Sequence, residues 1–259
     1  MDAQEVAARQ AEGSDAITAR MGALMLPLAV PVLVVAEYLH PHSEDPMEFS
    51  AVFTEYAHSH VWTTVHLAEY FGFLLLLGGL VALYYSLSPR PGAGAGLAPF
   101  GLAAAATTAA CFTVLQAVDG IALKRAVDAW ASAPASGKAA AFAAAEAVRW
   151  TEMGMNGLSF FLAGLTLFLF GSAIALGSVY PRWIGLIAAI SGAAFMYDGV
   201  GVVAYEGFVP STIKLVGLLL LAVWAFAMAP LMWRNGGRRG VSRSEPVIPG
   251  PDQRSVSAR

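Results

Sequence analysis

Long apolar segments separated by short polar connections run through the chain. Six of them have about twenty or more residues, the length that a helix needs to cross the hydrocarbon core of a bilayer. Because lipid offers the backbone no hydrogen-bond partners, each segment should be a helix. The pattern predicts an all-α fold, a polytopic membrane bundle of six transmembrane helices. The expected helices are 21–39, 60–87, 97–122, 153–177, 182–204 and 212–233.

The remaining chain divides into a polar N-terminal segment over 1–20 and a disordered basic tail over 234–259, on either side of a six-helix transmembrane domain over 21–233. Only 13% of the residues are charged and 57% are hydrophobic, whereas a soluble domain has roughly 25% charged residues. The net charge of −3 provides no field that would recruit a polyanion. The expected partner is therefore the lipid bilayer, and nucleic acid is excluded.

The distribution of Lys and Arg predicts the orientation, because cytoplasmic loops carry an excess of them. With the N-terminus inside, ten of the fifteen basic residues fall on the cytoplasmic side, and the first outer loop, 40–59, has none. We therefore expect a multi-pass protein of a bacterial-type cytoplasmic (plasma) membrane with both termini cytoplasmic. The third connection argues the other way, since it carries Lys124, Arg125, Lys138 and Arg149.

That third connection also has helical character. The pattern of the third span continues to Trp130, and an Ala-rich stretch from Lys138 leads into the fourth span. Two helices of about 35–40 residues would exceed a 30 Å core by 20 Å or more. We predict that 123–150 forms an outer helical hairpin that extends the third and fourth helices. The alternative is two ordinary spans joined by an Ala-rich interfacial loop.

The outer loop 40–59 contains a second helical pattern. Asp45-Pro46-Met47-Glu48 has the form of a capped helix start, and apolar residues follow at helical spacing. A short amphipathic helix is expected to lie on the outer surface or to cover the bundle. A folded loop with no role as a lid is the alternative.

Glycines recur every seven residues in the fourth and fifth spans. Glycine lets helix backbones approach closely, and a seven-residue repeat keeps one stripe toward a neighbour. Since the link between these spans is short, the two stripes are expected to face each other. They consist of Gly157, Gly164 and Gly171, and of Gly185, Gly192 and Gly199.

Ionisable and polar residues gather near the outer ends of the spans. Such residues are expensive in lipid and are candidates for a functional site. A polar cavity that opens outward would explain their common layer, whereas the alternative is that they anchor the chain among the headgroups. The candidate ligand-binding residues are His66, Glu69, Gln116, Asp119, Arg149, Glu152, Asn156 and Asp198.

A metal site is a second interpretation of the same region. All five histidines lie between 40 and 66, and His66 and Glu69 share a helix face. A transition metal or haem would be the cofactor, although no second span carries a histidine for a bis-histidine haem. A charge-paired cluster of Glu69, Asp119, Arg149, Glu152 and Asp198 is favoured over metal. The candidate metal ligands are His66, Glu69, His58, His60, His40 and His42.

The segment Tyr180-Pro181-Arg182-Trp183-Ile184-Gly185, followed by Gly192, resembles the start of the fifth span in a family of six-span bacterial membrane proteins with a domain of unknown function. The architecture of most of 20–233 is similar as well. The resemblance implies a six-span bacterial membrane protein, and it implies no activity or site residues.

Enzyme signatures are missing from the sequence. It contains no Gly-rich phosphate loop, no His-Glu-x-x-His and no Gly-x-Ser-x-Gly. We therefore favour a non-enzymatic protein whose outward-facing polar pocket binds an extracytoplasmic small molecule or a membrane protein partner. One alternative is a solute or proton-coupled transporter using Glu69, Asp119 and Asp198. Another is a metal- or haem-binding membrane redox protein using His66 and Glu69.

Overall fold

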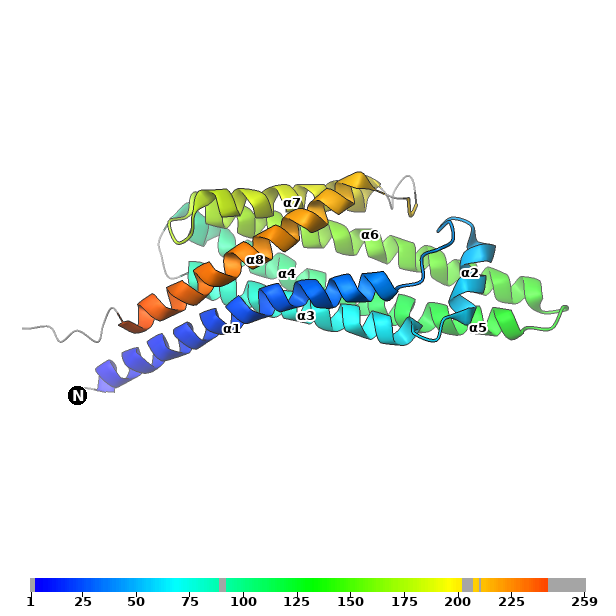
Figure 1. Cartoon of the computed structure of the whole chain (residues 1–259), viewed down its shortest axis with the longest axis horizontal. Coiled ribbons are helices and arrows are strands. Elements are labelled where there is room, and N and C mark those ends of the chain that lie inside the picture. The colour runs from blue at the N-terminus through cyan, green and yellow to red at the C-terminus, as the bar shows by residue number, and fades with distance from the viewer. Residues whose placement is uncertain (1–2, 89–91, 202–206, 210, 242–259) are drawn as a thin grey trace, which may run out of the picture.

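The computed structural model describes residues 3–88, 92–201, 207–209 and 211–241. All regular structure in these residues is helical (Figure 1). The elements are α1 (Ala3–Leu39), α2 (Phe49–His58), α3 (Trp62–Leu87), α4 (Ala93–Ala117), the π-helical turn η1 (Val118–Leu123), α5 (Lys124–Ser132), α6 (Lys138–Leu176), α7 (Arg182–Gly201) and α8 (Thr212–Val241).

Six helical stretches are long and apolar enough to cross a membrane, which confirms the expected number of spans. They are Gly13–Leu39, Trp62–Leu87, Ala93–Ser132, Lys138–Leu176, Arg182–Gly201 and Thr212–Gly236. Each overlaps one of the apolar segments in the sequence, so local hydropathy alone identified these helices.

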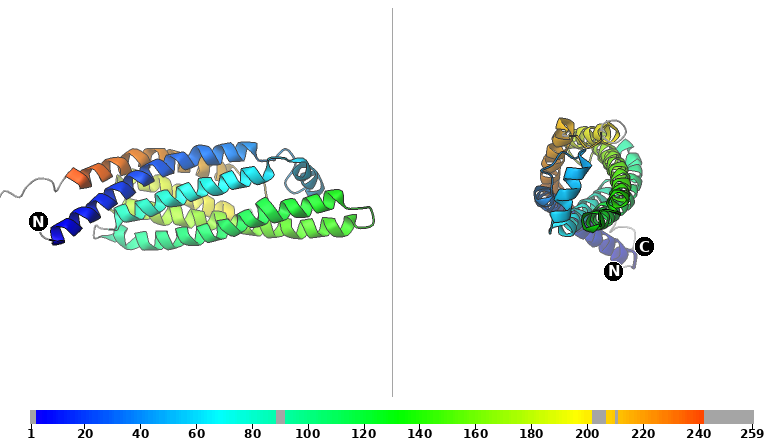
Figure 2. Two further views of the ribbon diagram at one scale, coloured as in Figure 1. Left: turned by 90° about the horizontal axis from the view of Figure 1, so that it is seen from below. Right: turned by 90° about the vertical axis from the view of Figure 1, so that its right-hand side faces the viewer.

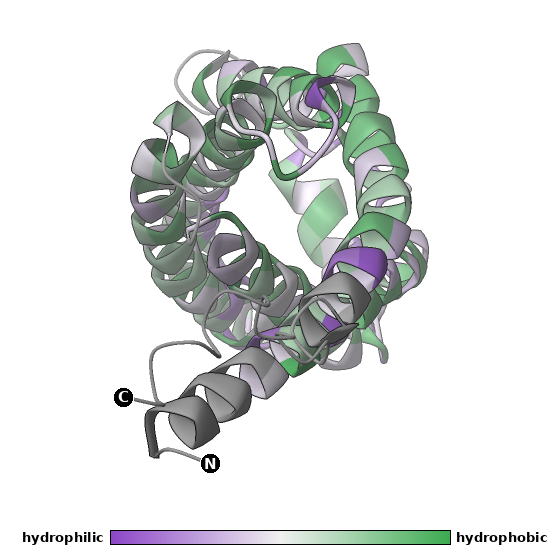
Figure 3. Ribbon diagram, turned by 90° about the vertical axis from the view of Figure 1, so that its left-hand side faces the viewer, coloured by the Kyte–Doolittle hydropathy of each residue, from purple (hydrophilic) through white to green (hydrophobic). Residues whose placement is uncertain are grey.

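The spanning helices form a closed ring in chain order. Each of α1, α3, α4, α6 and α7 packs against the next, and α8 closes the ring against α1. Figure 2 shows the ring along its axis, and Figure 3 shows that hydrophobic residues cover much of it. Large side chains such as Leu26, Phe170 and Trp224 fill the inside, while Phe71 and Ile190 face outward. The start of α1 and the end of α8 lie at one end of the ring, and α2 and α5 lie at the other (Figure 1).

The closest pair of helices is α6 and α7, whose glycine stripes face each other as predicted. A Cβ added to Gly199 would lie 2.5 Å from the Gly157 carbonyl oxygen, and one at Gly192 would lie 2.5 Å from the Gly164 carbonyl oxygen. Gly185 meets Gly171 in the same way, again at 2.5 Å. Six glycines therefore bring two backbones into contact over three successive pairs.

Two long helical stretches extend the bundle at the end that holds α2. The π-helical turn η1 joins α4 to α5 without a break, so that helix runs from Ala93 to Ser132. The 39-residue α6 starts at Lys138, after a short link, and α5 packs against it. These stretches are about 60 Å long at 1.5 Å per residue.

The short amphipathic helix expected in 40–59 is α2, but it begins later than the cap pattern predicts. The first helical residue is Phe49, and Glu48 at the N-cap makes no side-chain capping bond. Asp45 Oδ1 instead accepts a hydrogen bond from the Met47 amide at 3.0 Å, so it closes a turn that precedes the helix. The predicted capping box is therefore wrong.

The apolar face of α2 covers the bundle rather than remaining free. Its buried residues are Phe49, Val52, Phe53 and Tyr56. They form one hydrophobic cluster with residues of η1, α5 and α6, among them Leu123, Val127, Ala145 and Met153. Of the two expected positions of this helix, the structure thus shows the one that covers the bundle.

The expected disordered tail is in part helical, since α8 continues to Val241 and so covers the first residues of 234–259. The extension packs against α1, since a Cβ added to Gly236 would lie 3.0 Å from the Ala16 carbonyl oxygen. Likewise α1 begins within the expected polar N-terminal segment. Residues 242–259 lie outside the described residues.

Candidate functional site

Charged side chains that are buried in the structure gather at the end of the ring that carries α2. His66 lies on α3, Asp119 on η1, and Arg149 and Glu152 on α6. Their residues are between 2% and 9% exposed. These four expected site residues thus face the protein interior and not lipid.

The centre of this group is the pair of His66 and Asp119. His66 Nε2 lies 3.1 Å from Asp119 Oδ2. The other ring nitrogen, Nδ1, lies 2.8 Å from the Trp62 carbonyl oxygen. Since a carbonyl only accepts hydrogen bonds, Nδ1 carries the proton in the neutral ring and Nε2 has the free lone pair. Nε2 and Asp119 Oδ1 are both buried without a hydrogen-bond partner among the described residues.

The π-helical turn η1 places Asp119 beside His66. Single π-turns inside α-helices occur frequently at functional sites. The Trp62 indole donates a hydrogen bond to the Asp119 carbonyl oxygen at 3.1 Å. A Cβ added to Gly120 would lie 2.8 Å from the His66 Cβ, so only glycine permits this approach of η1 to α3. Backbone, indole and glycine together fix the pair.

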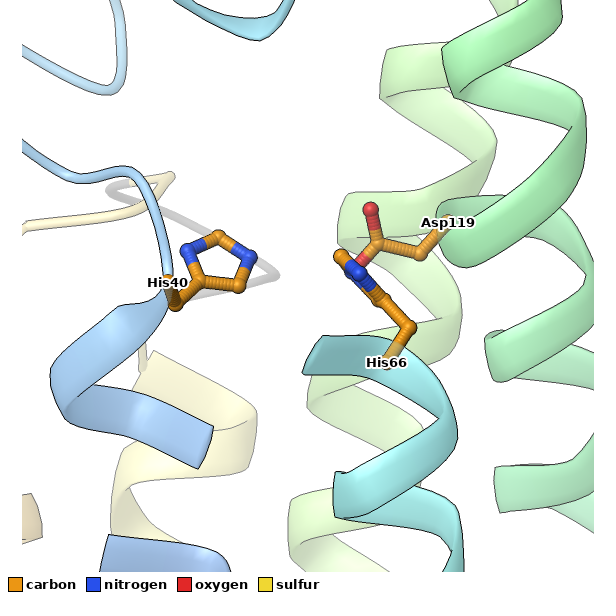
Figure 4. Close-up of side chains that lie close together, drawn as sticks. All are labelled: His40, His66 and Asp119. Atoms are coloured by element: carbon orange, nitrogen blue, oxygen red, sulfur yellow. The ribbon is translucent and has the colours of Figure 1, made fainter. Parts of the chain in front are cut away.

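A third residue with a side-chain nitrogen close to this pair is His40, which follows the last residue of α1. Its ring points toward His66 and Asp119 in Figure 4, and the centroids of the two histidine rings are 5.1 Å apart. One nitrogen or oxygen from each of His40, His66 and Asp119 lies within 4.8 Å of the others. His40 Nδ1 donates to the Pro41 carbonyl oxygen at 2.9 Å. Burial and the neighbouring His66 lower the pKa of His40, which favours a neutral imidazole.

The other expected metal ligands are not in this group. His42 bonds through Nδ1 to the His40 carbonyl oxygen, and His58 Nδ1 donates to the Thr54 carbonyl oxygen at 2.7 Å. His60 is exposed. Only the first His-x-His pattern contributes: His40 joins the group without His42, and both His58 and His60 stay outside it.

Glu69 has a different partner from the one that the sequence suggests. Its Oε2 accepts a hydrogen bond from Gln116 Nε2 at 3.2 Å. The acid beside His66 is instead Asp119, which comes from a different helix and which was predicted as a ligand-binding residue and a member of the charge-paired cluster, but not as a metal ligand. Sequence spacing paired His66 with Glu69, whereas in the structure the carboxylate in contact with His66 is that of Asp119.

Next to α2, a buried ion pair joins Arg149 to Glu152. Arg149 Nη1 lies 2.7 Å from Glu152 Oε2, and Nη2 donates to the Pro46 carbonyl oxygen at 3.4 Å. The guanidinium also lies over the rings of Tyr56, at 5.5 Å, and Phe208, at 4.9 Å. Arg149 thus connects α6 to the loop before α2, and its Nε has no hydrogen-bond partner among the described residues.

The remaining expected residues lie on neighbouring helices. Asp198 on α7 is buried, and its Oδ1 has no partner in the described part of the chain. Asn156 on α6 is half-buried. Neither belongs to the group of His40, His66 and Asp119.

Two aromatic residues that were not predicted as site residues lie against the site. The ring centroids of Tyr56 and Trp62 are 4.1 Å apart, and those of Trp62 and His66 are 4.5 Å apart. Trp62 also lies 5.2 Å from His40. The four-residue spacing of Trp62 and His66 on one helix face is a signal that could have identified the tryptophan.

No protein-family model matches the chain, and neither a curated protein nor a solved structure shows significant similarity to it. Membership in the family that the Tyr180–Gly185 segment resembles stays a prediction. In the structure this segment positions helices at the end opposite the site: the Tyr180 hydroxyl donates to Ser86 Oγ at 2.9 Å, and Gly185 meets Gly171.

Proposed function

We propose that the protein is a non-enzymatic integral membrane protein that binds a small polar ligand or ion at the outer end of its helix ring. In this proposal both termini are cytoplasmic, and the site around His66 and Asp119 opens to the outside. The helices α5 and the first part of α6 project beyond the bilayer as an outer hairpin.

The observation that carries the proposal is the set of buried polar atoms, at one end of the ring, that form no hydrogen bond within the described part of the chain. They include Gln116 Oε1, Asp119 Oδ1 and Arg149 Nε, together with His66 Nε2, whose contact with Asp119 Oδ2 at 3.1 Å is not a hydrogen bond. Each such atom costs about 1–3 kcal/mol when it is buried without a partner. Native proteins contain few of these groups, so several in one region favour a ligand that supplies the missing partners.

Two features support the orientation. The acidic loop 40–59 lies at the site end, whereas the arginine-containing ends of α1 and α8 lie at the other end. In addition, α6 is about 58 Å long, nearly twice the 30 Å hydrocarbon core. The part of α6 that exceeds the core would be its N-terminal half, where α5 packs beside it.

Cysteine labelling tests the orientation. In a Cys111→Ala background, a single cysteine is placed at Pro134, in the link between α5 and α6, or at Ser178, between α6 and α7. Both residues are exposed. A membrane-impermeant maleimide added to intact cells should label the first variant, and should label the second only after the cells are opened. Labelling in the reverse order would overturn the orientation.

A stability screen tests ligand binding. Because a ligand that binds only the folded state raises its stability, the purified protein is heated in detergent with a panel of amines, carboxylates, amino acids, sugars, inorganic anions and metal salts. At least one class should raise the unfolding temperature, and Asp119→Asn should abolish the rise. Asp128→Asn, the same change outside the site on α5, should preserve it. No stabilisation by any class, or equal loss in both variants, would refute the proposal.

A further inference from the structure

We propose that His40, His66 and Asp119 bind one divalent transition-metal ion, such as Zn²⁺, at the end of the helix ring. This inference rests on the proposed function, because it names the class of ligand that the same site would bind. The three residues come from the loop after α1, from α3 and from η1, so the ion would join three neighbouring elements.

The first argument is the orientation of the two imidazoles. Both donate through Nδ1 to a backbone carbonyl oxygen, that of Trp62 for His66 and that of Pro41 for His40. Histidines that bind metals almost always hold the other ring nitrogen in this way, because the bond fixes the tautomer and the ring orientation. Both Nε2 lone pairs are thereby left free to coordinate an ion.

The second argument is the contact between His66 and Asp119. The 3.1 Å separation of Nε2 and Oδ2 lies close to the ~3.3 Å that tetrahedral geometry gives two ligand atoms at ~2.0–2.1 Å from a zinc ion. A hydrogen bond accounts for the contact less well. With the proton on Nδ1, Nε2 has no hydrogen to donate to the carboxylate, and it makes no hydrogen bond within the described residues despite this distance. An ion bound between two lone pairs has no such alignment requirement.

The third argument is the chemistry and charge of the surroundings. Two imidazoles and a carboxylate form a donor set suited to zinc and to neighbouring divalent metals. Glu37 and Glu69 lie close enough to act electrostatically on His40 and His66, respectively. Their carboxylates add negative charge that favours a cation. With three protein ligands, one coordination position of a tetrahedral ion remains for water.

The geometry also decides against haem. A porphyrin bound to His66 would occupy the region directly in front of Nε2, but Asp119 Oδ2 lies 3.1 Å from that nitrogen. The ring of His40 is only 5.1 Å from that of His66. Donor atoms within 4.8 Å of one another suit a single small ion and not a macrocycle.

Metal binding to the full-length protein tests the inference. The chain is purified in detergent without a histidine tag, freed of metal, and dialysed against ZnCl₂ or CoCl₂. We expect one Zn²⁺ per chain by elemental analysis, and a visible Co²⁺ spectrum that differs from that of the aqueous ion. His40→Asn should weaken Zn²⁺ binding more than about 100-fold, since even changes to residues behind the ligands cost 10–100-fold.

The matched control removes the exposed histidines. The His58→Asn/His60→Asn variant should retain the Zn²⁺ affinity and the Co²⁺ spectrum of the unmodified protein, whereas Asp119→Asn should lose both. Circular dichroism and thermal unfolding establish that each variant is folded. His40 lies in a loop, so its replacement leaves the helix ring intact.

Two results would overturn the metal site: no Zn²⁺ bound to the unmodified protein, or equal binding by His40→Asn. The outcomes also separate this inference from the proposed function. If a solute of the screening panel stabilises the protein through Asp119 while Zn²⁺ and Co²⁺ do not bind, the polar site stands and the metal site falls. If Zn²⁺ binds but cysteine labelling reverses the orientation, the metal site stands and the outward-facing function falls.

Discussion

The contact between α6 and α7 makes a quantitative prediction about glycine. Gly192→Ala would place a methyl group 2.5 Å from both the Gly164 carbonyl oxygen and the Phe168 amide nitrogen. Both atoms belong to the backbone, so no side chain can rotate away. The helices would have to part by about 1 Å to reach ordinary contact, and overpacking of this kind costs about 1–3 kcal/mol.

The matched control is Gly154→Ala on α6, because a Cβ at Gly154 meets nothing within 4 Å. Alanine is the better helix former by up to about 1 kcal/mol. That gain applies to both variants, so the steric cost alone separates them. We expect Gly154→Ala to be as stable as the unmodified protein or more stable, and Gly192→Ala to be about 2 kcal/mol less stable than Gly154→Ala.

Unfolding in mixed detergent micelles, followed by tryptophan fluorescence, measures both free energies. The double variant Gly164→Ala/Gly192→Ala sharpens the result. Its two methyl groups occupy the same gap, so its destabilisation should be smaller than the sum of the single effects. If Gly192→Ala and Gly154→Ala have the same stability, the close backbone contact of α6 and α7 is refuted.

Three other predictions follow from contacts at the site end. Gly120→Ala should weaken Co²⁺ binding at least tenfold, because the added methyl group would move η1 away from His66. Gly96→Ala, whose Cβ meets nothing within 4 Å, should leave Co²⁺ binding unchanged. Equal Co²⁺ affinity in the two variants would contradict this role of Gly120. Glu152→Gln should destabilise the protein by about 3–5 kcal/mol in thermal unfolding, because it leaves the Arg149 charge buried and unpaired. The loss of stability should be smaller in Arg149→Met/Glu152→Met, which removes both charges. A smaller loss in Glu152→Gln than in the double variant would show that the ion pair does not stabilise the fold. Burial raises the pKa of Glu55, but hydrogen bonds from the Ser43 hydroxyl and amide outweigh it and hold that pKa below its usual value. The attachment of loop 40–48 to α2 through Glu55 should therefore be fully present above the usual carboxyl pKa and be lost as the pH falls through the lowered pKa of Glu55. In a carboxyl NMR titration, Ser43→Ala should raise the midpoint of Glu55. An unchanged midpoint would exclude the hydrogen bond between Ser43 and Glu55.

The sequence identifies features that depend on local pattern. An apolar run of twenty residues has one satisfactory structure in lipid, so the six helices follow from hydropathy. The pairing of Gly164 with Gly192 follows from the seven-residue spacing and the short link between their helices. In both cases the physical cause lies within one helix or between helices adjacent in the chain.

Features that depend on distant contacts are not visible in the pattern. Asp119 reaches His66 only because the helix adopts a π-helical turn there, and that turn depends on the packing of Gly120 and Trp62. His40 joins them because α1 ends beside α3. Similarly, α8 continues beyond its apolar pattern where Gly236 packs against the backbone of α1. The residue types in the site were predicted, but their grouping needed the closed ring.

The chain-ordered ring has a consequence for biosynthesis. His40, His66 and Asp119 all lie in the first half of the chain, on or beside α1, α3 and η1. These elements are neighbours in the ring, and they leave the ribosome before α6, α7 and α8 are made. The group of His40, His66 and Asp119 can therefore form on a nascent chain, and α8 then closes a ring in which this group is already assembled.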